Sequence, residues 1–310
     1  MERLDPVKGI FIKGKDDKDI FLYCWNKVSN PRAVVQVFHD IGEHAGRYKG
    51  FAEFLNDNGI IVYANDHRGH GKTAADEQSL GRIEGDAFNK ILEDELIIRD
   101  LIEENHGELP IIILGHGFGS FIAQEFIIEH GREIDKVILS GTAVMTGSDI
   151  KAALKLASMQ KRMFGDDSNG KIIENLLFRN YNSRFKDTSK SRLAWLNSDP
   201  EEVKKQEEDP LCNVTYSVGF YYYLLEAISK LYIEERLEKI PKELPILLLA
   251  GEEDPMGGYG ELVKRLYNIY RFKDIKDVQM SLYDGKRHDI LNEVNKDEVF
   301  EYILDWIKKI

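Results

Sequence analysis

The sequence has little cysteine, no long hydrophobic run and no excess of positive charge, and each absence excludes a class of protein. Its two cysteines, Cys24 and Cys212, lie far apart, so we expect buried thiols rather than a disulfide or a metal site. No apolar run approaches the ~18 residues that a membrane-spanning helix needs. Residues 1–8 lack the apolar core of a signal peptide. We therefore expect a cytoplasmic protein without a transmembrane segment.

The charge balance is acidic, with a formal net charge of −12 at pH 7. This excess argues against nucleic acid as a partner and against electrostatic docking on an anionic membrane, although it leaves open a transient contact with a membrane surface. Hydrophobic residues make up 43% and charged residues 31% of the 310 residues, which is typical of a folded globular chain. A chain of this length fits one large domain, with or without an insertion.

Short apolar segments recur along the chain and predict the strands of a mostly parallel sheet. Two of them flank a polar turn near the start and predict an N-terminal hairpin. The later ones are rich in Val and Ile and do not alternate, as expected for strands that are buried on both faces. The predicted strands are residues 9–13, 20–25, 33–38, 60–64, 110–114, 136–140, 245–250 and 278–283.

Helical patterns separate these strands, so the fold class is α/β, with right-handed crossovers between parallel strands. The alternation stops after Gly141, and residues 142–243 carry helical patterns without a convincing buried strand. We expect an α/β core from residues 1–141 and 244–310, with 142–243 inserted as a helical cap, or lid, over the sheet edge where ligands bind. The predicted core helices are 47–57, 86–106, 118–130 and 296–309, and the predicted helices of the insertion are 150–163, 171–179 and 218–232.

The segment Gly115–Gly119 reads Gly-His-Gly-Phe-Gly, between an apolar run and a helical pattern. Strand, glycine turn and helix form the context of the nucleophile elbow G-x-S-x-G, in which a serine attacks the substrate. Here Gly117 takes the place of that serine, so nucleophilic attack from this position is impossible. Ser120 is not expected to replace it. This residue comes three positions after Gly117, in the first helical turn, where capping or packing is its expected role.

Two later residues complete the pattern of a catalytic triad. Asp254 follows a buried strand and a glycine, and His288 lies in a loop after the last strand. Each alone is the kind of residue found in ordinary turns, but the chain order of nucleophile position, acid and histidine is that of the α/β-hydrolases. We therefore assign Asp254 and His288 to the acid and base positions.

The loop after residues 33–38 is the candidate for an oxyanion hole. The backbone N–H groups of Ile41 and Phe118 are expected to face the developing negative charge. Asp40 is electrostatically unfavourable in this loop, since a carboxylate aimed inward would repel the developing negative charge. We therefore expect the Asp40 side chain to point to solvent.

The segment Asp66–Gly71, Asp-His-Arg-Gly-His-Gly, is interpreted as a structural loop. A metal site is not expected, because the histidines that could meet at this sheet edge match no standard zinc spacing: His39, His44, His67, His70 and His116. In the insertion, the aromatic residues Trp195, Phe220 and Tyr223 are candidates for ligand contacts, although apolar residues of a cap more often serve packing than ligand binding.

Three segments carry a family resemblance. His39–Tyr48 matches H-G-x-G-E-H-x-x-R-Y except that Asp40 replaces a glycine, and Asp66–Thr73 matches D-H-R-G-H-G-x-S with Thr at the end. Gly115–Gly119 matches G-H-S-M-G with Gly117 for Ser and Phe118 for Met. With these motifs the chain resembles the monoacylglycerol lipase and lysophospholipase-like branch of the α/β-hydrolases, often grouped with serine aminopeptidases of the S33 type.

The resemblance implies an α/β-hydrolase fold and hydrolysis of a carboxylic ester, such as a monoacylglycerol or a lysophospholipid, without a metal or organic cofactor. Carried over by position, the nucleophile falls on Gly117, and His288, oriented by Asp254, would activate it. Two hypotheses then remain: a hydrolase inactivated by substitution so that it traps substrate, or a natural non-catalytic relative that binds a lipid-like or acyl ligand under its cap. A third keeps residual catalysis through water activated by His288.

Overall fold

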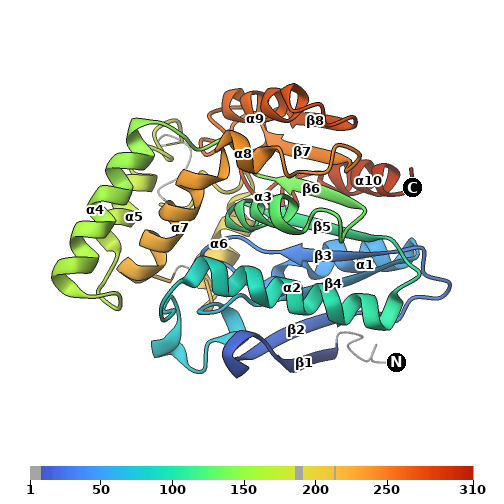
Figure 1. The fold of residues 1–310 in the computed structure, drawn as a ribbon, viewed down its shortest axis with the longest axis horizontal. Coiled ribbons are helices and arrows are strands. Elements are labelled where there is room, and N and C mark those ends of the chain that lie inside the picture. Colours follow the sequence, from blue (N-terminus) through green and yellow to red (C-terminus); the bar gives the residue numbers. More distant parts are fainter. Residues whose placement is uncertain (1–7, 186–190, 213, 310) are drawn as a thin grey trace.

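The computed structural model describes residues 8–185, 191–212 and 214–309, which build one eight-stranded sheet (Figure 1). The strand order is β1-β2-β4-β3-β5-β6-β7-β8, in which β1–β2 and β2–β4 pair antiparallel and the other neighbours pair parallel. All eight predicted strands and the N-terminal hairpin are confirmed, with small shifts at their ends. The strands are β1 Lys8–Lys13, β2 Asp19–Trp25, β3 Ala33–Phe38, β4 Ile60–Asn65, β5 Ile111–His116, β6 Lys136–Ser140, β7 Ile246–Gly251 and β8 Val278–Tyr283.

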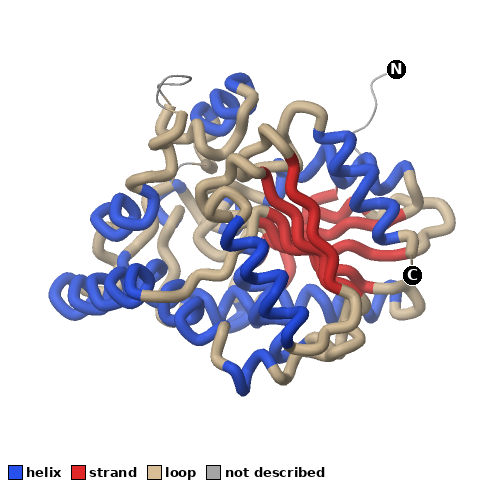
Figure 2. The backbone as a smooth tube through the Cα atoms, turned by 90° about the horizontal axis from the view of Figure 1, so that it is seen from above, coloured by secondary structure: helices blue, strands red, loops and turns tan. Residues whose placement is uncertain are grey.

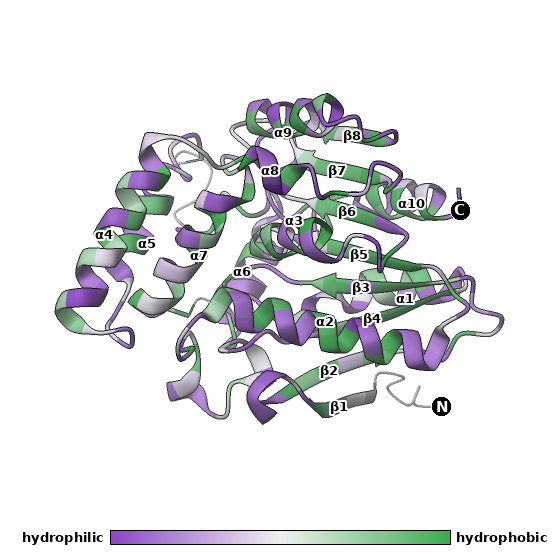
Figure 3. Ribbon diagram, viewed as in Figure 1, coloured by the Kyte–Doolittle hydropathy of each residue, from purple (hydrophilic) through white to green (hydrophobic). Residues whose placement is uncertain are grey.

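Helices cover both faces of this sheet, as Figure 2 shows for the strands between their flanking helices. Apolar residues of α1 and α10 pack into the core on one face, and those of α2, α3 and α9 pack into the core on the other. Both cores need the unalternating Val and Ile of the strands, which Figure 3 colours green along β3, β5, β6 and β7. The bounds are α1 Lys49–Asp57, α2 Ala87–His106, α3 Phe118–His130, α9 Glu261–Phe272 and α10 Lys296–Ile307.

The chain between β6 and β7 is helical, and α4, α5 and α7 lie together at one end of the sheet (Figure 1). The helices here are α4 Ser148–Phe164, α5 Lys171–Phe178, α6 Pro200–Glu208, α7 Val218–Leu231 and the short α8 Glu234–Leu237. The predicted patterns found α4, α5 and α7 but missed the short α8 and also α6, whose polar sequence has only Val203 and Gln206 buried. They also missed α9 in the core, which has a regular apolar face.

Helix α3 approaches the end of β3 closely, because Gly119 in its first turn has no side chain. A Cβ on Gly119 would lie 2.0 Å from the carbonyl oxygen of Phe38 at the end of β3. This contact brings the N-terminus of α3 against the loop that follows β3, and so places the two halves of the candidate site side by side.

Both cysteines are buried, Cys24 in β2 and Cys212 after α6. Among the described helices, none is long and apolar enough to cross a membrane.

The packing of α3 gives a test of the core. Phe126 is fully buried and lies against Phe38, with ring centroids 6.0 Å apart. We expect Phe126→Ala to lower the free energy of unfolding by about 3–5 kcal/mol, through lost burial and a cavity. Phe272→Ala is the control, because this side chain is 84% exposed, and its effect should stay within about 0.5 kcal/mol. Equal losses in urea denaturation of the two variants would contradict this account.

Candidate active site

The candidate residues follow four parallel strands at one edge of the sheet. Asp40 comes after β3, Gly117 after β5, Asp254 after β7 and His288 after β8. Carboxyl ends of parallel strands meet at the same edge, where open α/β sheets bind their ligands. The sheet therefore brings together groups that lie up to 248 residues apart in sequence.

Asp254 and His288 pair as their chain order predicts. His288 Nδ1 lies 2.9 Å from Asp254 Oδ2, and both residues are fully buried. The backbone N–H of Met256 donates to the other oxygen, Asp254 Oδ1, at 2.8 Å and fixes the carboxylate. This arrangement orients the imidazole so that Nε2 faces the end of β5, as the acid and histidine of a triad require.

Gly117 has the backbone geometry of a sharp strand-to-helix turn. Its φ is 52° and its ψ is −117°, a region that glycine enters with little strain. Its N–H donates to the carbonyl oxygen of Ser140 at 3.0 Å. The space beyond its Cα is already filled, because a Cβ there would lie 2.1 Å from Cγ and Oδ1 of Asp40.

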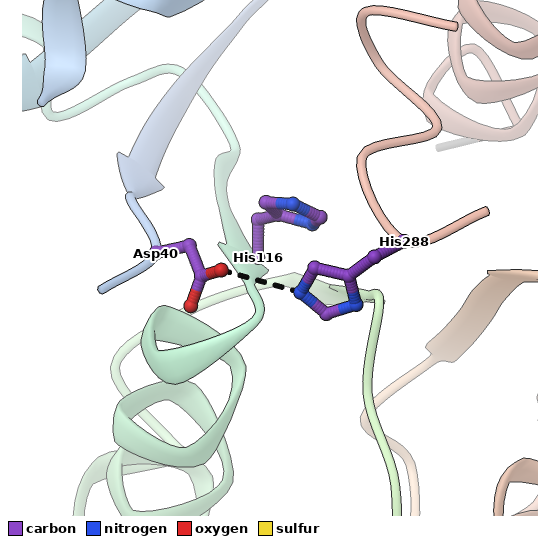
Figure 4. A group of neighbouring side chains, drawn as sticks. All are labelled: Asp40, His116 and His288. Carbon is purple, nitrogen blue, oxygen red and sulfur yellow. Dashed lines mark hydrogen bonds and ion pairs between the residues drawn. The ribbon is translucent and has the colours of Figure 1, made fainter. Parts of the chain in front are cut away.

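Asp40 is therefore the residue that occupies the nucleophile position, and the expectation that it points to solvent is wrong. It is 4% exposed. Its Oδ1 accepts the backbone N–H of Phe118 at 2.5 Å, and its Oδ2 lies 3.2 Å from His288 Nε2 (Figure 4). The glycine at position 117 leaves room for this carboxylate, so the two departures from the family motifs form one structural feature.

Asp40 and His288 form a buried ion pair. Burial alone would raise the pKa of Asp40, but the hydrogen bond and charge of His288, with smaller effects of His116 and the Phe118 N–H, lower it below 3.8. Burial alone would lower the pKa of His288, but Asp254 and then Asp40 raise it well above 6.5. At neutral pH the imidazole is thus protonated and held between two carboxylates.

The expected oxyanion hole is only partly present in this form. The Phe118 N–H points into the site as predicted, but Asp40 already accepts its hydrogen bond. Ile41 lines the adjacent cavity, and the next N–H, that of Gly42, donates to the hydroxyl oxygen of Tyr216 at 2.8 Å. Asp40 thus takes the hydrogen bond that a substrate oxyanion would receive from Phe118.

A second set of buried charges, which the sequence analysis did not single out, holds the Asp40 loop to the His288 loop. Glu43 Oε1 accepts the backbone N–H of Asp40 at 2.9 Å and the hydroxyl of Tyr48 at 2.7 Å. Arg47 bridges Glu43 Oε2 and Asp289 Oδ2, at 3.0 Å each. Because Asp289 follows His288 directly, this bridge fixes the distance between the Asp40 carboxylate and the His288 imidazole.

A small apolar cavity of about 60 Å³ opens beside Asp40. Trp195 lines it and lies over His288, with ring centroids 4.9 Å apart. Phe220, a predicted ligand contact, instead packs against Phe118 and His70 and is not among the residues that line this cavity. Tyr223 faces away, with its hydroxyl 2.7 Å from Lys161 Nζ, and does not line the cavity. The remaining lining residues come mostly from the helical segment and α3: Ile41, Phe118, Phe121, Met145, Leu177, Phe178, Tyr181, Tyr221, Leu224, Leu225, Ile228 and Met256.

The Asp66–Gly71 loop has the structural role that the sequence suggests. Asp66 accepts the backbone N–H groups of Ala45 and Lys72, and so ties this loop to the Asp40 loop. The ring centroids of His39 and His67 lie 4.0 Å apart in a stacked arrangement, and the backbone N–H of His67 donates to His39 Nε2 at 2.9 Å.

Only His116 of the five histidines approaches the candidate triad. Asp40, His116 and His288 each offer a ligand atom, all within 4.8 Å of one another, and Figure 4 shows the three side chains. These are donors that zinc or iron accepts, but Asp40 and His288 already pair with each other here. Ser120 is fully buried and its hydroxyl donates to the Gly117 carbonyl oxygen at 2.7 Å, away from any nucleophilic position.

The ion pair predicts a titration that NMR can follow. Since His288 binds its proton more tightly in the folded protein, its contribution to stability is complete below pH 6.5 and is lost as the pH rises through its raised pKa. Asp40 contributes fully above pH 3.8 and loses its contribution as the pH falls through its lowered pKa. We expect Asp40→Asn to lower the pKa of His288 in an imidazole ¹⁵N titration. An unchanged value would show that the two side chains do not pair.

The chain is similar to known hydrolases over most of its length. The family model described as "Serine aminopeptidase, S33" matches residues 29–295. Monoglyceride lipase of Rattus norvegicus is 26% identical over 293 residues, covering 93% of this chain and 86% of the relative. Monoacylglycerol lipase of Mycolicibacterium smegmatis is 26% identical over 286 residues, covering 91% and 90%.

Solved structures agree with these relatives. A thermostable carboxyl esterase from Bacillus coagulans, in complex with glycerol, superposes with a TM-score of 0.89 at 29% identity, covering 99% of each chain. A structure described as a lipase in its open form gives 0.88 at 26% identity, covering 98% of each. With its sheet order and its buried Asp254–His288 pair, the chain therefore belongs to the serine aminopeptidase S33 family of α/β-hydrolases, a family of serine ester hydrolases that includes the monoglyceride lipases.

Proposed function

We propose that this protein keeps the ligand site of the ester hydrolases but does not form their serine acyl-enzyme. The observation that carries the proposal is the carboxylate of Asp40 in the place of the serine hydroxyl. It holds His288 Nε2 at 3.2 Å and accepts the Phe118 N–H at 2.5 Å. Both the general base and the oxyanion donor of acyl transfer are thus engaged by the protein itself.

The proposed ligand is an acyl or lipid-like molecule held under a cap formed by residues 142–243. Its support is the apolar lining of the cavity beside Asp40, to which α5 and α7 contribute Leu177, Leu224 and Leu225. A pocket of apolar side chains with few polar groups suits a hydrocarbon chain. Relatives described as monoglyceride lipases act on ligands of this class by name.

The alternative is a hydrolase whose serine was replaced by glycine to trap a substrate. The packing around position 117 argues against it, because a serine Cβ would collide with Asp40 as it lies here. A chain altered only at position 117 would carry the family's glycine at position 40. The natural coding sequence at codon 117 decides directly, since a serine codon would refute the pseudoenzyme proposal.

Restoring the serine tests how the two positions depend on each other. We expect Gly117→Ser alone to stay inactive on p-nitrophenyl acyl esters, because Asp40 blocks the hydroxyl and the Phe118 N–H. The double variant, Asp40→Gly with Gly117→Ser, should have a kcat at least about 10³-fold higher than that of Gly117→Ser alone, since loss of a triad serine lowers kcat by up to about 10⁶-fold. Turnover of the p-nitrophenyl esters measures kcat, and labelling by a fluorophosphonate reports whether the serine at residue 117 is reactive. His288→Ala, added to the double variant, is the control and should abolish the labelling. Full labelling of the single variant would refute the proposed blockade.

Ligand binding is tested by filling the cavity. Leu177 and Ile172 lie on the same helix, α5, but Leu177 lines the cavity and Ile172 is 62% exposed. We expect Leu177→Trp to weaken binding of a fluorescent acylglycerol at least tenfold, about 1.4 kcal/mol, and Ile172→Trp to leave Kd unchanged. Calorimetric titration measures both. Undiminished binding in Leu177→Trp would place the ligand elsewhere.

A further inference from the structure

We propose that Asp40 is itself a nucleophile, and that it attacks a saturated electrophilic carbon, that of an epoxide ring carried on an apolar chain. The epoxide would lie in the cavity beside Asp40, so this inference rests on the lipid-like ligand proposed above. It does not need an acyl-enzyme at position 117.

The geometry contains the three parts of an activated nucleophile. A nucleophile lies within hydrogen-bond reach of a histidine, which a third group orients. Here Asp40 Oδ2 lies 3.2 Å from His288 Nε2, and His288 Nδ1 lies 2.9 Å from Asp254 Oδ2. The displaced triad is Asp40–His288–Asp254. The remaining nucleophile oxygen, Oδ1, accepts the Phe118 N–H at 2.5 Å, which leaves Oδ2 as the attacking atom.

A carboxylate nucleophile reacts productively with a saturated carbon but not with an ester carbonyl carbon. A carboxylate that adds to an ester carbonyl gives an intermediate that expels the weaker base, which is the carboxylate itself, so the reaction reverts. A saturated carbon offers no such return, because the new C–O bond forms as the leaving group departs. The leaving group must then be activated, and an epoxide is activated by its ring strain.

The first step balances with the groups present. Asp40 Oδ2 forms a bond to one ring carbon, and the bond from that carbon to the ring oxygen breaks. The ring oxygen stays attached to the neighbouring carbon and takes the Nε2 proton of the His288 imidazolium. The products are an alkyl ester of Asp40 that bears a hydroxyl group and a neutral His288. The pKa of His288 is raised, so the imidazole carries this proton at neutral pH and can donate it.

The second step uses the neutral His288 as a general base. It takes a proton from water, and the hydroxide adds to the ester carbon, whose oxygen Oδ1 receives the Phe118 N–H as it becomes negative. Collapse breaks the bond to the alkyl oxygen, which takes the proton back from His288. The Asp40 carboxyl then gives its own proton to His288, and the ion pair is restored. The sum is epoxide plus water to a vicinal diol.

Tyr181 supplies a hydrogen-bond donor among the residues that line the same cavity. It lines the cavity with Asp40, and its ring packs edge-on against Trp195 at 4.9 Å. Burial, with the charges of Asp254 and Asp40, raises the pKa of its hydroxyl, which keeps the phenol protonated. A neutral phenol in this place polarises the ring oxygen while Asp40 attacks, and the apolar walls take the chain.

The test uses the full-length chain with 1,2-epoxydecane and mass spectrometry of its peptides. His288→Gln leaves the nucleophile and the Tyr181 hydroxyl, which replaces His288 as the proton donor to the ring oxygen, but it removes the base of the second step. We therefore expect an adduct of one epoxide per chain on the peptide that contains Asp40. Diol formation should fall at least about 10³-fold in this variant. Asp40→Asn should give neither adduct nor diol, and Asp149→Asn, an exposed carboxylate on α4, should behave as the parent.

Isotope placement makes the outcome decisive even where Asp40→Asn folds poorly. In H₂¹⁸O the parent protein should gain ¹⁸O in the Asp40 carboxyl, and the diol of the first turnover should carry only ¹⁶O. Label in the diol but not in Asp40, no adduct in His288→Gln, or a reaction abolished by EDTA, as a metal on Asp40, His116 and His288 would require, would each overturn the inference. Binding of the acylglycerol probe without adduct refutes this inference alone, and loss of binding refutes the proposed function as well.

Discussion

The contact between the Asp40 carboxylate and the His288 imidazolium is the interaction on which the site depends. Both groups are almost entirely withdrawn from water, a cost that a single ion pair seldom offsets. Here the imidazolium is shared by Asp254, and the Phe118 N–H neutralises part of the charge on Asp40. Removal of His288 would leave two buried carboxylates without a counter-charge, and removal of either carboxylate would leave the imidazolium with one partner instead of two, so the three loops depend on each other electrostatically.

The rest of the molecule holds those loops at fixed distances. Parallel strands present their ends at one edge, and the absent side chain of Gly119 lets α3 approach β3 closely enough for the Phe118 N–H to reach Asp40. The Arg47 bridge between Glu43 and Asp289 then ties the first loop to the last. The hydroxyl of Tyr216 on the Gly42 N–H links the same loop to the helical segment. Preorganisation of this kind makes a polar group in an apolar pocket useful for chemistry.

The strands could be predicted because their short apolar runs are unalternating and rich in Val and Ile. The assignment of Asp254 and His288 followed from chain order. Helix α6 was missed because its surface is polar on nearly all sides. The orientation of Asp40 was predicted wrongly, since a carboxylate in an oxyanion loop looks unfavourable until the space above Gly117 is known. The available signal was the pairing of the two departures: a missing side chain at one position and an extra one at another. Only the fold shows that the two positions are in contact.

The clash at Gly117 also makes positions 117 and 40 dependent on each other. A glycine at position 117 is compatible with glycine or with aspartate at position 40, whereas a side chain at position 117 and the aspartate in its present place exclude each other. A serine introduced at position 117 alone would have to displace a buried carboxylate from two partners, the imidazole of His288 and the backbone N–H of Phe118. The geometry of the site thus opposes a change at position 117 alone, and the two positions have to change together.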